Sequence, residues 1–159
     1  MTQQFVFISV KKQQLYCYDN DKLVMRYPVS TAKNGLGELE GSECTPRGWH
    51  RVYSHIGMDA DINSIFIGRK WTGEIYSPEL YINSTRDWIL TRIVQLEGLE
   101  EGRNKGGSVD TLKRYIYIHG IPDEIDMTTP SSHGCIRMLS KDVISFAQWV
   151  KYHAPVCIE

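Results

Sequence analysis

The stretch FVFISVKKQQLYCYDNDKLVMRYPVS, Phe5–Ser30, decides the fold class of this chain. It holds three short runs rich in β-branched and aromatic residues, FVFISV, QQLYCY and LVMRYPVS, and such residues favour strands. The segments KK and DND between them are typical of tight turns between antiparallel neighbours. The chain is therefore predicted to begin with a β-meander.

Further strands are predicted downstream, separated by loops. The glycine-rich segment TAKNGLGELEGSECTPRG, residues 31–48, has no hydrophobic periodicity and predicts a long surface loop of the kind that often borders a functional site. Strands are then expected in WHRVYS (49–54), SIFIGR (64–69) and VCIE (156–159), and a loop in TGEIYSPEL (72–80).

Two segments have the pattern of amphipathic helices. In RDWILTRIVQLEG, residues 86–98, a helical spacing relates four apolar residues, Trp88, Ile89, Ile93 and Leu96, and Gly98 follows as a typical helix stop. The segment SKDVISFAQWVKYHAP, residues 140–155, offers Ser140 as an N-cap and a single apolar stripe. The predicted class is mostly β with two or so α-helices.

Length and charge limit the function classes. At 159 residues and 42% hydrophobic residues, the chain is expected to form a single domain over residues 1–159. Eighteen basic and nineteen acidic residues give a formal net charge of −1. We therefore expect neither nucleic acid nor an anionic membrane as a partner.

The start of the chain, MTQQFVFISV, has neither a basic region nor a small-residue cleavage site. Its apolar run is also too short to span a membrane, so a cytoplasmic protein is expected. Four scattered cysteines, Cys17, Cys44, Cys135 and Cys157, are expected to be free thiols, and all but Cys135 are expected to be structural.

Two motifs near the C-terminal end contain candidate catalytic residues. In RYIYIHG, residues 114–120, strand alternation places Tyr115, Tyr117 and His119 on the face opposite the core, so His119 is expected to point toward a surface or cleft. Sixteen positions later, SSHGCIRM, residues 131–138, contains Cys135. A cysteine attacks as its thiolate, and a neighbouring imidazole can take the proton to give a thiolate–imidazolium pair.

The residues around Cys135 suggest acyl transfer. His119, which arrives from another element, is favoured as the base, whereas His133 is expected to shape the pocket or to donate a hydrogen bond. Backbone amides around Gly134 and Cys135 would stabilise an oxyanion. Arg137 would bind a substrate carboxylate.

The motifs YIHG and SHGCIRM resemble those of the L,D-transpeptidase catalytic domain (YkuD-like) family, and YPVSTAKNGLGELEGSECTPRGWHRV is similar to that family's strand, glycine-rich loop and TPxG turn. The resemblance covers residues 5–158 and implies a β-sandwich-like L,D-transpeptidase catalytic fold. It also implies that Cys135 is the nucleophile, that His119 is the base and that the Gly120 carbonyl orients this base. Ser132, His133, Gly134 and Arg137 map to the family's loop around the nucleophile.

The same resemblance implies a substrate. Cys135 would attack the L,D bond after meso-diaminopimelate in a peptidoglycan stem tetrapeptide, and D-alanine would leave. With a cytoplasmic location, the expected activity is that of an L,D-carboxypeptidase that trims tetrapeptide to tripeptide in muropeptide recycling, with no cofactor. The alternatives are an L,D-transpeptidase that forms cross-links or exchanges D-amino acids, and a non-catalytic domain that binds peptidoglycan fragments.

Other readings of the same residues stay open. His119, His133 and Cys135 could hold zinc, but a fourth ligand at regular spacing is missing. A papain-like peptidase is disfavoured because its cysteine normally precedes its histidine. Tyr117 either lines the pocket or packs in the sheet, and Arg69 is either a second carboxylate clamp or a solvated strand-end arginine.

Overall fold

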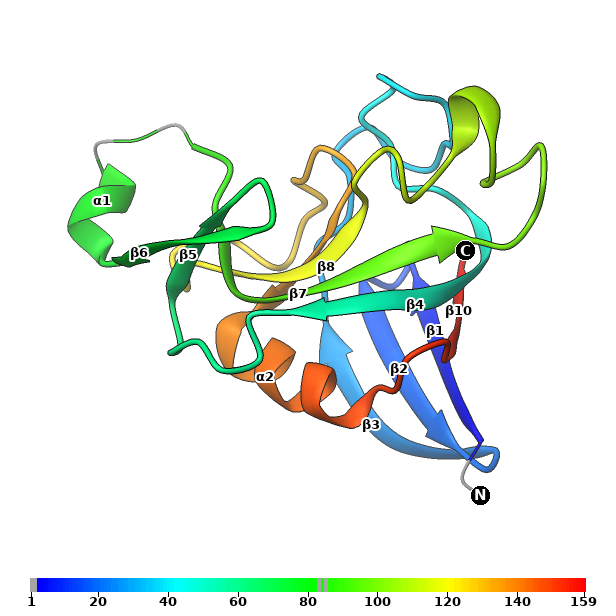
Figure 1. Ribbon diagram of the computed structural model, residues 1–159, viewed down its shortest axis with the longest axis horizontal. Helices are drawn as coiled ribbons and strands as arrows, with labels where there is room; N and C mark the ends of the chain where they lie inside the picture. Colours follow the sequence, from blue (N-terminus) through cyan, green and yellow to red (C-terminus); the bar gives the residue numbers. More distant parts are fainter. Residues whose placement is uncertain (1–2, 83, 85) are drawn as a thin grey trace.

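The computed structural model describes residues 3–82, 84 and 86–159 (Figure 1). Over these residues the strands form one ten-stranded sheet: β1 (Gln4–Ser9), β2 (Gln14–Asp19), β3 (Lys22–Pro28), β4 (Gly48–Ile56), β5 (Ser64–Ile67), β6 (Lys70–Ile75), β7 (Ile89–Gly98), β8 (Tyr117–Ile121), β9 (Ile136–Leu139) and β10 (Pro155–Ile158). The helices are α1 (Pro78–Ile82), the short 3-10 helix Gly107–Val109 and α2 (Ser140–Trp149).

The sheet runs in the order β3-β2-β1-β10-β4-β7-β5-β6, and β8 joins β7 to β9. The first three strands pair antiparallel as the predicted meander. The last strand, β10, lies between β1 and β4, parallel to β1 and antiparallel to β4. The sheet curls, so that β1–β3 face β7 and β8 across the interior, with α2 beside them (Figure 1).

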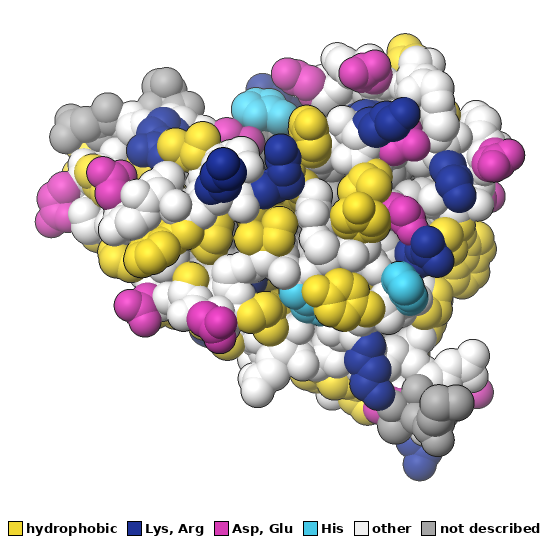
Figure 2. Space-filling model, viewed as in Figure 1, with side chains coloured by type: hydrophobic (Ala, Val, Ile, Leu, Met, Phe, Trp, Pro, Cys, Tyr) yellow, Lys and Arg dark blue, Asp and Glu magenta, His cyan; other side chains and the backbone are white. Residues whose placement is uncertain are grey.

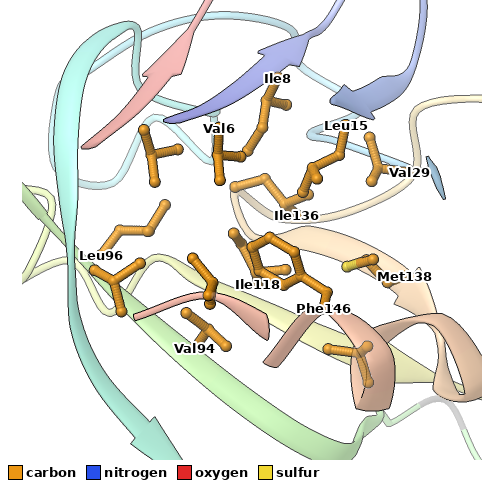
Figure 3. Close-up of a cluster of buried hydrophobic side chains, with 14 of the residues drawn as sticks. Val6, Ile8, Leu15, Val29, Val94, Leu96, Ile118, Ile136, Met138 and Phe146 are labelled. Carbon is orange, nitrogen blue, oxygen red and sulfur yellow. The ribbon is translucent and has the colours of Figure 1, made fainter. Parts of the chain in front are cut away.

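Side chains from both parts of the curled sheet meet in one core (Figure 3). Burial alternates along β1, and its inward residues Val6 and Ile8 are fully buried. Helix α2 places Phe146 against them from the other side. The mostly β class with two α-helices and the sandwich-like arrangement are thereby confirmed.

The helix predicted over residues 86–98 is wrong, because Ile89–Gly98 is the strand β7. This strand is buried on both faces: Val94 and Leu96 belong to the main core, whereas Ile93 packs with Phe66 and Tyr117 on the opposite face. A strand buried on both faces has a continuous apolar run without alternation, and part of that run fits a helical spacing by chance.

Two smaller predictions also fail. Residues 72–80, predicted as a loop, contribute to β6 and α1, which extend beyond the core (Figure 1). Ser140 is not an N-cap, because Leu139 occupies that position without a side-chain cap. The Ser140 hydroxyl instead accepts a hydrogen bond from Thr91 Oγ1 at 2.6 Å. The strands predicted in 49–54, 64–69 and 156–159 are confirmed as β4, β5 and β10.

Charge is spread over the surface. Figure 2 shows basic and acidic side chains interspersed on the face in view, in keeping with the net charge of −1. The four cysteines are free thiols. Among the described residues, no helix has the length and apolar content needed to cross a membrane.

His50 gives the fold a pH dependence. It is fully buried, its Nδ1–H donates to the Gly48 carbonyl at 3.0 Å, and Nε2 accepts from Thr111 Oγ1 at 2.9 Å. Burial lowers the pKa of His50 to about 4. Since the unfolded chain takes up this proton near pH 6.5, the stability is fully present above that pH and is lost as pH falls toward 4.

We therefore expect the free energy of unfolding to fall between pH 7.5 and 4.5 by roughly 3 kcal/mol more in the native protein than in His50→Gln. Urea unfolding of both proteins at the two pH values measures this difference. Equal losses in the two proteins would show that another group causes the acid sensitivity.

Candidate active site

Strand pairing brings the two predicted catalytic residues together. β8 and β9 are parallel neighbours in which Ile118 pairs with Ile136 and His119 with Arg137. Cys135 directly precedes β9, so it lies beside Tyr117, two residues before His119 on the same face of the pair. The residues Ile116 and Ile118 point into the core on the other face, as predicted.

Cys135 and His119 line one cavity of about 300 Å³. Its other lining residues come from the β5–β6 turn, the start of β7, the strand β8 with its preceding segment, and the nucleophile loop: Gly68, Arg69, Asp87, Ile89, Arg114, Tyr115, Ile116, Tyr117, Ser132 and His133. The cavity therefore collects most of the residues that the sequence motifs single out, from segments far apart in the chain.

The Cys135 thiol is held by backbone groups of the segment that enters β8. Its Sγ accepts the Tyr117 N–H at 3.3 Å, and its S–H donates to the Tyr115 carbonyl at 3.4 Å. Tyr115 has a φ of 58°, an uncommon value for a bulky residue. Burial raises the pKa of the Cys135 thiol to about 12. This shift favours the neutral thiol at neutral pH.

His119 is held in one tautomer. Only 1% of the residue is exposed, although it borders the cavity, and its Nδ1 lies 2.8 Å from the Gly120 carbonyl. Because a carbonyl can only accept, Nδ1 bears the proton and Nε2 keeps a lone pair. A side chain at Gly120 would not fit, since its Cβ would lie 2.6 Å from the Leu90 carbonyl oxygen.

Burial also lowers the pKa of His119, so the imidazole is neutral at neutral pH. The raised pKa of Cys135 and the lowered pKa of His119 both act against the thiolate–imidazolium pair expected from the sequence. Burial disfavours the charged form of both partners, and a neutral pair results. In this site the proton would move only as the thiol attacks.

The backbone around Cys135 is held by the Ser132 hydroxyl. This side chain, on a residue only 2% exposed, donates to the Cys135 carbonyl at 2.6 Å and accepts the Gly134 N–H at 3.1 Å. The Gly134 amide is thereby occupied. Of the two amides expected to stabilise an oxyanion, only that of Cys135 is left without a partner among the described residues.

Arg137 is not among the residues that line the Cys135 cavity. Its guanidinium donates from Nη2 to Asp87 Oδ1 at 2.8 Å and from Nη1 to Ser131 Oγ at 3.0 Å. It borders a neighbouring cavity of about 340 Å³ that it shares with Arg86 and Trp88. His133, in contrast, borders the Cys135 cavity with an exposed side chain, and its Nδ1 lies 3.9 Å from Asp87 Oδ2.

Arg69 and Tyr117 form one unit at the cavity. Arg69 Nη1 donates to the Tyr117 hydroxyl at 2.9 Å, and the guanidinium lies 4.1 Å from the centre of the Tyr115 ring. Tyr117 is 4% exposed and also packs against Phe66 and Ile93. Both readings of Tyr117 thus hold, and Arg69 is engaged at the cavity instead of being free in solvent.

Sequence reasoning missed Asp87 and Arg114. Asp87 pairs with Arg137 and borders the cavity, but it falls in the segment that was assigned to a helix. Arg114 also borders the cavity and donates to the Cys44 carbonyl at 2.7 Å. Arg114 directly precedes YIYIHG, and this position next to the His119 motif is the sequence feature that could have identified it. Within the described part of the chain, no group of three His, Cys, Asp or Glu residues is arranged to bind a metal ion.

A family model described as the L,D-transpeptidase catalytic domain, YkuD, matches residues 3–158. The fold is similar to solved L,D-transpeptidases from Mycobacterium smegmatis (TM-score 0.59, 13% identity, 99% of this chain and 59% of that one) and Xylanimonas cellulosilytica (0.55, 18%, 99% and 61%). It is also similar to L,D-transpeptidase 3 from Mycobacterium tuberculosis, in complex with a faropenem-derived adduct. Here the TM-score is 0.61 and the identity 15%, and the match covers 99% of this chain and 60% of that one.

The chain thus spans about three-fifths of the length of these solved chains, and at such identities the likeness concerns the fold alone. No curated protein matches the chain significantly.

The high pKa of the Cys135 thiol predicts how it reacts with iodoacetamide. Since only the thiolate reacts, we expect the alkylation rate of Cys135 to rise about tenfold per pH unit between pH 7 and 10, without a plateau. Mass spectrometry of the peptide that contains Cys135 separates its reaction from that of the half-buried Cys44. A plateau reached at or below pH 7 would instead demonstrate a preformed thiolate–imidazolium pair.

Proposed function

Because the chain belongs to the L,D-transpeptidase catalytic domain (YkuD) family, we propose that it is a cysteine-dependent L,D-carboxypeptidase. It would remove the terminal D-alanine from peptidoglycan stem tetrapeptides containing meso-diaminopimelate, in muropeptide recycling. Enzymes of this family are cysteine acyl-transfer enzymes that act on peptidoglycan peptides. The observation that carries the proposal is the placement of Cys135 and a tautomer-fixed His119 on one cavity.

The proposed reaction begins with proton transfer. As Cys135 Sγ attacks the carbonyl carbon between meso-diaminopimelate and D-alanine, its proton moves to Nε2 of His119. The Cys135 N–H stabilises the oxyanion. On collapse, the C–N bond breaks, D-alanine leaves with the proton from His119, and a thioester on Cys135 remains. Water then attacks the thioester as His119 takes its proton, the C–S bond breaks, the proton returns from His119 to Cys135 Sγ, and the tripeptide is released.

The charge of the cavity supports removal of a terminal residue. Arg69 and Arg114 both border it, and a guanidinium binds the free carboxylate of a terminal D-alanine better than it binds a continuing peptide chain. Arg114 already donates to the carbonyls of Glu38 and Cys44, which leaves Arg69 as the freer of the two. Ser132 would act through the Cys135 loop, and His133 at the rim of the cavity.

Transpeptidation would share the first half of this reaction and differ only in the acceptor, an amine in place of water. The cavity of about 340 Å³ beyond the Asp87–Arg137 pair offers space for a second peptide next to the site. Product analysis therefore has to include an acceptor.

We expect the purified protein, incubated with a disaccharide tetrapeptide, to release tripeptide and D-alanine in equal amounts, both with and without an excess of D-methionine. Cys135→Ala is expected to lose at least about 10³-fold of this activity, because it lacks the nucleophile. Mass spectrometry identifies the products. D-methionine exchanged into the tetrapeptide would support the transpeptidase instead. If no product depends on Cys135, the chain is instead a non-catalytic domain that binds peptidoglycan fragments.

The lowered pKa of His119 predicts the pH profile. Activity requires the neutral imidazole, so kcat/KM for the tetrapeptide should be flat from neutral pH down to about 6.5 and should fall only below that value, where His119 becomes protonated. The rate is measured from pH 4.5 to 8 in buffers of constant ionic strength. A decline that already begins above pH 7 would contradict a buried neutral base.

A further inference from the structure

We propose that Thr45 is a positioning residue for acyl transfer: its hydroxyl orients the peptide group between Gly134 and Cys135, so that the Cys135 N–H is presented to the oxyanion. This inference rests on the proposed acyl-transfer function and assigns a role to the long loop between β3 and β4. Thr45 lies 90 positions before the nucleophile in the sequence and does not border the cavity.

The hydrogen bonds of Thr45 fix the direction of its proton. The side chain is fully buried, and its Oγ1 accepts the Ala32 N–H at 3.0 Å. The same oxygen lies 2.9 Å from the Gly134 carbonyl oxygen, which can only accept. The hydroxyl proton of Thr45 is therefore directed at Gly134.

Because the peptide group is trans, the direction of the Gly134 carbonyl determines the direction of the Cys135 N–H. The C=O of Gly134 and the N–H of Cys135 lie in one plane and point in opposite directions, because no cis peptide bond occurs in the described chain. The Gly134 carbonyl points toward Thr45, which does not border the cavity, so the Cys135 N–H points away from Thr45. This N–H is the one left unbonded by the described residues.

Hydrogen bonds on both sides of Thr45 hold the loop that bears it. The Thr45 N–H donates to the Gly35 carbonyl at 2.9 Å, and the Thr45 carbonyl accepts the Gly37 N–H at 2.9 Å. Arg114 binds the adjacent carbonyl of Cys44 at 2.7 Å. Thr45 can therefore hold Gly134 in place, since its own backbone is held from both sides.

Gly134 lies against this loop and has a φ of 134°, a value that favours glycine. A Cβ at this position would lie 3.2 Å from the Cys44 carbonyl oxygen and 3.0 Å from Ile116 Cδ1. The close approach of the two loops and the hydrogen bond from Thr45 therefore hold the Gly134 peptide in the same orientation.

Two small reagents separate oxyanion stabilisation from thiol reactivity. In p-nitrophenyl acetate, Cys135 Sγ attacks the acetyl carbonyl, its proton goes to His119, an oxyanion forms, and p-nitrophenolate leaves to give an acetyl thioester. In iodoacetamide, Sγ displaces iodide at a saturated carbon, so no carbonyl oxyanion forms. A residue that positions the Cys135 N–H should affect only the first reaction.

We expect Thr45→Val to lower the rate of Cys135 acetylation about 10- to 100-fold, with the alkylation rate within about twofold of the native value. Thr45→Ser keeps the hydroxyl and should restore acetylation to within about threefold. Thr111→Val is the matched control, because it removes another fully buried threonine hydroxyl, bonded to His50 away from the site, and should leave both rates within about twofold.

Both rates are measured on Cys135 by peptide mass spectrometry at pH 8, with Thr45→Ala used if Thr45→Val is insoluble. A parallel loss of both rates, or acetylation at the native rate without the hydroxyl, would overturn the assignment. If the native protein fails to cleave the tetrapeptide while the acetylation results stand, the proposed substrate is wrong and the role of Thr45 is retained.

Discussion

Backbone hydrogen bonds between the parallel strands β8 and β9 hold His119 opposite Arg137 and bring Cys135 beside Tyr117. His119 and Cys135 are 16 positions apart in the sequence and come from different segments of the chain. The parallel register brings them to one cavity, because it aligns the residues just before β9 with the first residues of β8. The core face of the same pair, with Ile118 and Ile136, anchors that register in the main hydrophobic cluster.

Burial of this pair determines its chemistry. The packing around Cys135 and His119 reduces their solvation, which raises the pKa of the thiol and lowers that of the imidazole. Both shifts favour neutral partners at rest, so in the proposed reaction charge would develop only during attack. The Gly120 carbonyl at His119 and the amide of Cys135 would then stabilise the developing charges.

Local patterns predicted much of this arrangement. The meander of β1–β3 followed from short β-branched runs, and the spacing of His119 and Cys135 indicated the site. Other features depend on the folded neighbours and have no local signal. The continuous apolar run of β7 fits a helical spacing because both faces of the strand are buried. Asp87 and Arg114 reach the cavity through tertiary contacts, and the neutral resting pair follows from a burial that the sequence does not reveal.

The central claim is that Cys135 forms a covalent acyl-enzyme with a stem peptide, and intact-protein mass spectrometry after rapid acid quenching tests it most directly. The account predicts a mass gain equal to the acyl tripeptide portion of the substrate, mapped to the peptide that contains Cys135. The adduct should persist in Cys44→Ala, which removes the other half-buried thiol. It should be absent in Cys135→Ala. Turnover without such an adduct, or an adduct on another residue, would contradict the account.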